Sequence, residues 1–176
     1  MDVWLKDEFK KFSNDRLIDF IQMASRNFWT LQNNWMFHVE KRFGHEIAVE
    51  LDTICYGRAM EVQTHRLKKF FNLKDDLESL VQVLKFSLFG LYAEGLEYEV
   101  SDHRAIRRVR RCPMQLRRLE DGLPELYCKQ ALTSTASKIA RVINPAIKVV
   151  SVMAPPDSHP KDRWCETVYE LKQNIG

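Results

Sequence analysis

Three of the four cysteines in this chain lie in its second half, each at a point where the predicted secondary structure changes. Cys112 ends an arginine-rich extended run, Cys128 lies near the start of a predicted helix, and Cys165 opens the last predicted strand. Thiolates are preferred ligands of zinc and related soft metals, and ligands at such positions can converge on one site. Cys112, Cys128 and Cys165 are therefore a candidate site for zinc or another divalent metal.

Two other roles suit the same cysteines. No Cys-x-x-Cys pair is present to form the local chelate of a typical zinc site, and cysteine is often a small buried apolar residue. We favour this packing role. Alternatively, the dipole of the following helix would lower the pKa of Cys128 and make it a nucleophile. Both chemical roles require the three sulfurs to face one interior site.

Arginines are concentrated in residues 104–118, which contain seven of them in fifteen positions. One inward-pointing arginine, Arg108 or Arg110, would neutralise the carboxylate of a small ligand. Nucleic-acid binding through this segment ranks third, because no aromatic residues are interleaved for base stacking and nearby acids such as Glu97 compensate the charge. The net charge of +3 is likewise too small to indicate a nucleic-acid partner.

The first half of the chain, residues 1–92, is predicted to be helical. A helix of about 30 residues follows Ser13-Asn14-Asp15 and ends at Gly44, a second spans about residues 45–71, and a third begins at Asp75 and ends before Gly90 and Gly95. The first of these helices is unusually aromatic between Arg26 and Trp35. Since its aromatic residues cannot share one stripe, we expect it to bury a second face, under a neighbouring layer or in a homodimer.

The second half, residues 93–176, is predicted to contain a sheet. Apolar and polar residues alternate over 96–100, a second extended run covers 105–112, and further strands cover 146–153 and 164–171. Between them, a helix begins at Pro124 and ends at Asn144-Pro145. The sequence therefore predicts an α+β fold, in which long N-terminal helices pack on a four-stranded antiparallel sheet with the order β-β-α-β-β.

Length and composition favour a single globular domain that spans residues 1–176. The chain is 45% hydrophobic, and a single hydrophobic core can stabilise a chain of this length. The N-terminus lacks the basic and apolar regions of a signal peptide, and no long apolar run indicates a membrane span. We therefore expect a cytoplasmic protein with reduced cysteines and no membrane partner.

Two groups of motifs carry a resemblance to a known family. They are the helical run from Trp35 to Ala48 with Leu51-Asp52, and the series Cys112, Leu126-Tyr127-Cys128, Asn144-Pro145 and Cys165-x-x-Val-Tyr. This pattern resembles the L-2-amino-thiazoline-4-carboxylic acid hydrolase-like proteins, which are mostly uncharacterised. More distantly it is similar to the four-vinyl reductase or hydrocarbon-binding domain, whose relatives include haem-binding sensors and transport-complex subunits. The resemblance implies a ligand enclosed between helices and a four-stranded antiparallel sheet.

The function predicted from the sequence is binding of a small anionic or partly apolar molecule between helices and sheet. The alternative is a metal-assisted hydrolase of a small cyclic amide or thiazoline-type substrate. Whether the protein is an enzyme stays open. The candidate ligand-binding residues are Trp35, His38, Arg108, Arg110 and Cys128. Of these, His38 is also a candidate acid-base group, and Asp52 places a carboxylate in the same helical region.

Overall fold

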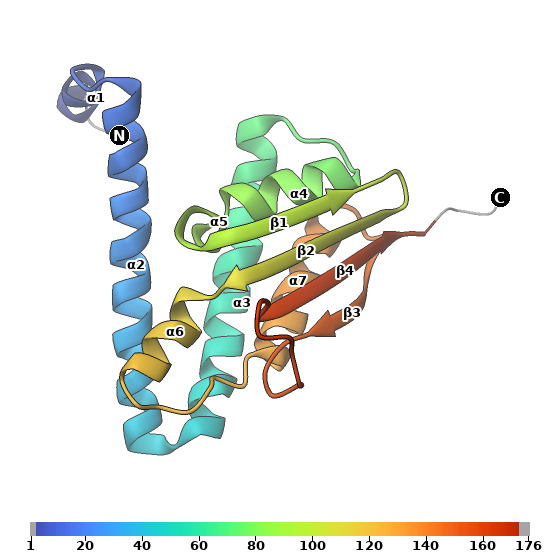
Figure 1. The fold of residues 1–176 in the computed structure, drawn as a ribbon. Helices are drawn as coiled ribbons and strands as arrows, with labels where there is room; N and C mark the ends of the chain where they lie inside the picture. Colours follow the sequence, from blue (N-terminus) through green and yellow to red (C-terminus); the bar gives the residue numbers. More distant parts are fainter. Residues whose placement is uncertain (1–2, 173–176) are drawn as a thin grey trace.

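Long helices occupy the first half of the chain, as the apolar spacing predicts (Figure 1). This computed structural model describes residues 3–172; Met1, Asp2 and residues 173–176 of the predicted domain lie outside the described residues. A short helix α1 (Val3–Lys10) precedes α2 (Asn14–Phe43) and α3 (His45–Phe71), which form an antiparallel pair. Gly44 joins the pair with φ of 91°, a conformation that glycine adopts without a steric penalty.

The third predicted helix is divided in two. Helix α4 (Leu77–Phe86) begins after Asp76, whose side chain accepts a hydrogen bond from the Ser79 backbone N–H at 2.8 Å. Ser87 then has extended backbone, and its hydroxyl accepts from the Gly90 N–H at 3.0 Å, so it caps the five-residue helix α5 (Leu88–Tyr92). The division matters because it directs the α5 residues toward the sheet and α2.

Four antiparallel strands form one sheet, with the spatial order β1-β2-β4-β3. They are β1 (Glu94–Val100), β2 (Arg104–Arg111), β3 (Ile147–Met153) and β4 (Cys165–Leu171). Because side chains on neighbouring strands share a face when their residues pair, the register places Tyr98, Arg107 and Thr167 in one row across β1, β2 and β4. The predicted α+β fold with a four-stranded antiparallel sheet is confirmed.

Two features between β2 and β3 differ from the prediction. Helix α6 (Pro113–Glu120) is an additional element, and α7 (Lys129–Ile143) begins five positions after the predicted start at Pro124. The later start of α7 is caused by a tertiary contact. The Gln115 side-chain amide donates to the Leu126 carbonyl and accepts from the Leu126 N–H, both at 2.9 Å, which holds this segment in a non-helical conformation.

Helices α3, α4 and α7 cover one face of the sheet, while α2 lies along the edge of this helical layer (Figure 1). The main core fills the space between the layers, and a smaller core cluster lies where α2 and α3 meet the segment before α7. The largest buried side chains include Trp29, Tyr169, Met60, Leu80 and Ile143. One end of this interlayer space is left partly unfilled, and the candidate site lies there.

Candidate functional site

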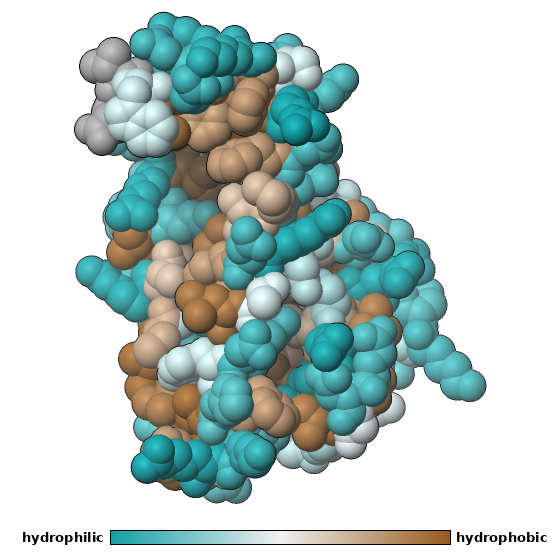
Figure 2. Space-filling view, turned by 90° about the vertical axis from the view of Figure 1, so that its left-hand side faces the viewer, coloured by the Kyte–Doolittle hydropathy of each residue, from teal (hydrophilic) through white to brown (hydrophobic). Residues whose placement is uncertain are grey.

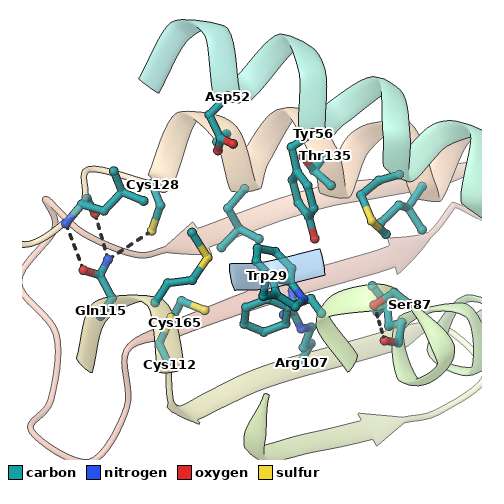
Figure 3. Close-up of a pocket in the computed structure, with 18 residues that line it drawn as sticks. Trp29, Asp52, Tyr56, Ser87, Arg107, Cys112, Gln115, Cys128, Thr135 and Cys165 are labelled. Atoms are coloured by element: carbon teal, nitrogen blue, oxygen red, sulfur yellow. Dashed lines mark hydrogen bonds between the residues drawn. The ribbon is translucent and has the colours of Figure 1, made fainter. Parts of the chain in front are cut away.

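A cavity of about 100 Å³ lies between the helices and the inner face of the sheet (Figure 3). Its residues come from α2, α3, α4, the α5 region, β2, α6, α7 and β4. Most of the wall is apolar, including Met60, Leu84, Leu132 and Ile139, and few polar groups reach it. Such an apolar concavity with a few convergent polar groups is typical of small-molecule sites.

Arg107 is the cationic group of this cavity. It lies on the inward row of β2 between Ala105 and Val109, and its residue is only 9% exposed. Its guanidinium carbon lies 4.8 Å from the centre of the Phe89 ring, a favourable cation–π distance. Within residues 3–172, no ion pair joins Arg107 to a carboxylate. A buried cation without a counter-ion is costly, so this arrangement is a signal of function.

Neither candidate for the one inward-pointing arginine, Arg108 or Arg110, points inward, which corrects that part of the prediction. Arg108 binds Glu166 at 2.6 Å and also pairs with Glu99, while Arg110 pairs with Glu97 and, at 2.8 Å, with Asp162. The cause is strand alternation: residues 108 and 110 are one and three positions from Arg107 and therefore occupy the opposite face.

Three further arginines of the segment also have protein partners. Arg111 lies 3.8 Å from Glu94, Arg117 lies 2.9 Å from Asp121, and Arg118 forms a two-point pair with Glu40. Carboxylates thus compensate much of the charge that motivated the third-ranked nucleic-acid prediction.

Aromatic rings surround the end of the cavity near Arg107. Trp29 is buried; its indole N–H donates to the Leu88 carbonyl at 3.0 Å, and its ring stacks on Tyr92 at 5.5 Å. Tyr56 and Phe89 contact the same indole, with ring centres at 5.5 and 5.6 Å. These rings make an apolar wall next to a positive charge.

Three buried hydroxyl groups have no hydrogen-bond partner within the described part of the chain: those of Thr135, Thr167 and Tyr169. Thr135 lines the cavity, and Thr167 is a direct cross-strand neighbour of Arg107. Buried polar groups are normally satisfied, so hydroxyls lacking partners around a cation indicate room for further hydrogen bonds there, to water or to a ligand.

Asp52 faces the cavity from α3, on the helical side opposite Arg107 (Figure 3). It is buried, and Gln32 on α2 donates a hydrogen bond to its carboxylate. Burial raises the pKa of Asp52 from 3.8 to about 6, although the Gln32 hydrogen bond acts in the lowering direction. Asp52 therefore changes charge close to neutral pH, as a general base or acid would.

Cys112, Cys128 and Cys165 all line this one cavity, so they meet the minimum condition for a shared site. Burial raises the pKa of each thiol, that of Cys165 to about 12. This corrects the expectation for Cys128: it does precede helix α7, but desolvation outweighs the helix dipole and raises its pKa.

The thiols do not form a metal centre in the part of the chain described. No group of three or more His, Cys, Asp or Glu side chains among residues 3–172 is placed to hold a metal ion. Protonated, buried thiols are also poor nucleophiles. The arrangement agrees with the packing role, in which the sulfurs form part of the apolar wall.

Trp35 and His38, the remaining predicted ligand residues, lie on α2 as exposed side chains and do not line the cavity. Sequence reasoning missed Trp29, Tyr56, Phe89, Arg107 and Thr135. One signal was available for Arg107. Residues 105, 107 and 109 share a face, and the small apolar Ala105 and Val109 mark that face as the buried one.

The whole cavity falls within the region that matches a known family. A family of unknown function, DUF6125, matches residues 10–171. The chain belongs to the DUF6125 family. No curated protein and no solved structure matches this DUF6125 chain. Within residues 3–172, no helix is both long enough and apolar enough to cross a membrane.

Proposed function

We propose that this DUF6125 domain binds a small, largely apolar molecule in the cavity between its helices and its sheet, with an anionic group of the ligand directed at Arg107. The observation that carries the proposal is the buried Arg107 guanidinium without a carboxylate partner in residues 3–172. A ligand carboxylate would supply the missing counter-ion and could bind the planar guanidinium at two points.

The size and lining of the cavity support a ligand of about one ring or a short chain. An engineered apolar cavity of about 150 Å³ holds benzene, and the cavity here measures about 100 Å³. Trp29, Tyr56 and Phe89 offer apolar faces to such a ligand. The Thr135 hydroxyl, which lacks a described partner, supplies a further hydrogen-bonding group.

Calorimetric titration with pairs of matched compounds tests this proposal. Benzoate and hexanoate are compared with benzamide and hexanamide, which keep the shape and lose the charge. We expect the carboxylates to bind more tightly than the amides, and Arg107→Met to weaken carboxylate binding by roughly 10-fold or more, because a charge-assisted hydrogen bond is lost.

Arg110→Met is the matched control, since Arg110 lies on the same strand but pairs with Glu97 and Asp162 on the outer face. It should leave carboxylate affinity unchanged, and melting curves establish that both variants fold. Equal affinity for acids and amides, or an equal loss in both variants, would contradict the proposal.

A hydrolase of a small cyclic amide or thiazoline-type substrate is the second proposal, favoured by one observation. Asp52 lies in the motif region that resembles the hydrolase-like proteins, lines the cavity, and has its pKa raised by burial to about 6. Such a carboxylate can take a proton from an attacking water near neutral pH. Asp52→Asn should then abolish turnover of a thiazoline carboxylate and leave its binding intact; unchanged turnover would reject this role.

A further inference from the structure

Helix α2 has two apolar stripes, and the body of the protein covers only one of them. The covered stripe contains Ser25, Trp29 and Met36, which are all buried. Ser25 and Trp29 both donate hydrogen bonds to the Leu88 carbonyl, at 2.9 and 3.0 Å, so this stripe is firmly attached to α5. The position of α2 relative to the sheet is thereby set without the second stripe.

The second stripe runs for five turns along α2. Its members are separated by alternating steps of four and three residues: Leu17, Ile21, Ala24, Phe28, Leu31 and Trp35. This is the 3.5-residue repeat of a helix that packs along another helix. Ile21 is 49%, Leu31 70% and Trp35 37% exposed, so the repeat has no helical partner within residues 3–172.

Figure 2 shows the consequence on the molecular surface. Apolar side chains gather along the face formed by α1 and α2, between hydrophilic groups on either side. Ile18 and Phe20, which flank the second stripe, are also exposed and extend it. Contiguous apolar surface of this extent on a folded domain marks an interaction site.

We infer that this stripe of α2 binds the same stripe of a second copy of the chain, forming a two-fold symmetric homodimer. The exposed parts of Ile18, Phe20, Ile21, Leu31 and Trp35 amount to roughly 500 Å² of apolar surface, and a stable dimer buries about 800 Å² per partner, of which about 65% is apolar. The available apolar area therefore matches the requirement of one homodimer interface.

The residues beside the stripe favour a second copy over a different helix. On the side away from the body, the flanking positions of the repeat are Phe20, Asn27 and Asn34, none of them charged. Charged flanking residues select oppositely charged partners and repel an identical helix. Neutral flanks allow two identical helices to approach, and a symmetric pair then uses the same surface twice.

Sedimentation velocity and light scattering on the full chain test this inference. We expect the wild-type protein to be a dimer at about 10 µM, the range in which standard-sized interfaces persist. Leu31→Glu and Ile21→Glu should each raise the dimer dissociation constant by roughly 100-fold or more, because a charge would be buried against its own copy. Both side chains are substantially exposed, and circular dichroism establishes that the variants fold.

Phe70→Glu is the matched control, because Phe70 is 79% exposed on α3 and lies outside the stripe. It should leave the dimer intact. A wild-type chain that stays monomeric at tenfold higher concentration overturns the inference, and so does a dimer that the two α2 variants leave unchanged. Recovery of the wild-type protein only in complexes with other proteins would assign the stripe to a different partner and also overturn it.

Discussion

The cavity contains two buried ionisable side chains whose loss of hydration opposes folding. Arg107 is buried without a carboxylate partner in residues 3–172, and Asp52 is buried with only the Gln32 amide as a neutral donor. The two lie on opposite sides of the cavity, the first on the sheet and the second on α3 (Figure 3). Residues that form a binding site commonly lower the folding stability of a protein, so substitutions of Arg107 and Asp52 are expected to change the free energy of unfolding.

Asp52 makes stability depend on pH in a defined direction. Its pKa is higher in the folded chain, about 6 against 3.8, so folding favours the protonated form. The contribution of Asp52 to the free energy of unfolding is fully present below about pH 4. It is lost as the pH rises through about 6, which lowers the free energy of unfolding by a total of about 3 kcal/mol. Asp52→Asn stays neutral and should therefore become more stable than wild type as pH rises.

Urea unfolding of both proteins between about pH 4 and pH 7.5 checks this difference. The value at pH 4 is the internal control, because neither side chain is charged in the folded protein there. Asparagine also keeps an oxygen that accepts the Gln32 hydrogen bond. A difference in unfolding free energy that stays constant over this range would show that Asp52 is not shifted.

At the scale of elements, one buried ion pair attaches α6 to the α2–α3 turn. Arg118 donates to both Glu40 oxygens, at 2.6 and 3.0 Å, and also to the Pro124 carbonyl at 2.9 Å. His45 lies 2.8 Å from the same carboxylate. The hydrogen bonds from Arg118 lower the pKa of Glu40 to about 2. His45 also lowers this pKa, while burial acts in the raising direction. Since Cys112 directly precedes α6 and Gln115 lies within it, this ion pair also fixes one wall of the cavity.

Glu40→Gln should destabilise the protein by about 3–5 kcal/mol, because it leaves the buried Arg118 charge uncompensated. Asp121→Asn is the matched control: it removes the exposed pair with Arg117 on the same helix and should cost less than about 1 kcal/mol. Chemical denaturation gives both values. Similar losses in the two variants would mean that the Glu40 pair does not anchor α6.

At the scale of the whole molecule, the N-terminal end projects from the layered body. Helix α1 and the first turns of α2 extend beyond the sheet in Figure 1. Ring contacts with Phe20 of α2 are made by Phe9 of α1 and by Phe12, which lies between the two helices. The cavity and the main core draw on residues from Trp29 onward.

Removal of residues 1–12 should therefore lower the unfolding free energy by less than about 1 kcal/mol, because few contacts with the body are lost. The shortened chain keeps Ser13, whose hydroxyl caps α2. Trp29→Ala is the contrasting variant and should cost about 3–5 kcal/mol, since it empties a core position. Thermal unfolding measures both. A large loss on truncation would show that α1 belongs to the cooperative unit.

The amino-acid sequence by itself determined the elements that depend on local chemistry. Apolar spacing, the Ser13 and Gly44 helix ends, and the polar–apolar alternation of β1 and β4 predicted the helical pair and the antiparallel sheet. These signals suffice because each acts within a few residues. The resemblance carried by the sequence motifs predicted a ligand site between the two layers, and a cavity lies there.

Only the tertiary structure decided which groups face that cavity. Both faces of β2 carry arginines, and although Ala105 and Val109 mark the Arg107 face as the buried one, only the tertiary structure places Arg107 at the cavity. It also places Arg108 and Arg110 on the outer face, where they pair with carboxylates. The later start of α7 likewise depends on Gln115 binding Leu126, eleven residues away. The burial that raises the pKa of Asp52 and of the three thiols comes from α2, α7 and the sheet together, and no local pattern in the sequence records it.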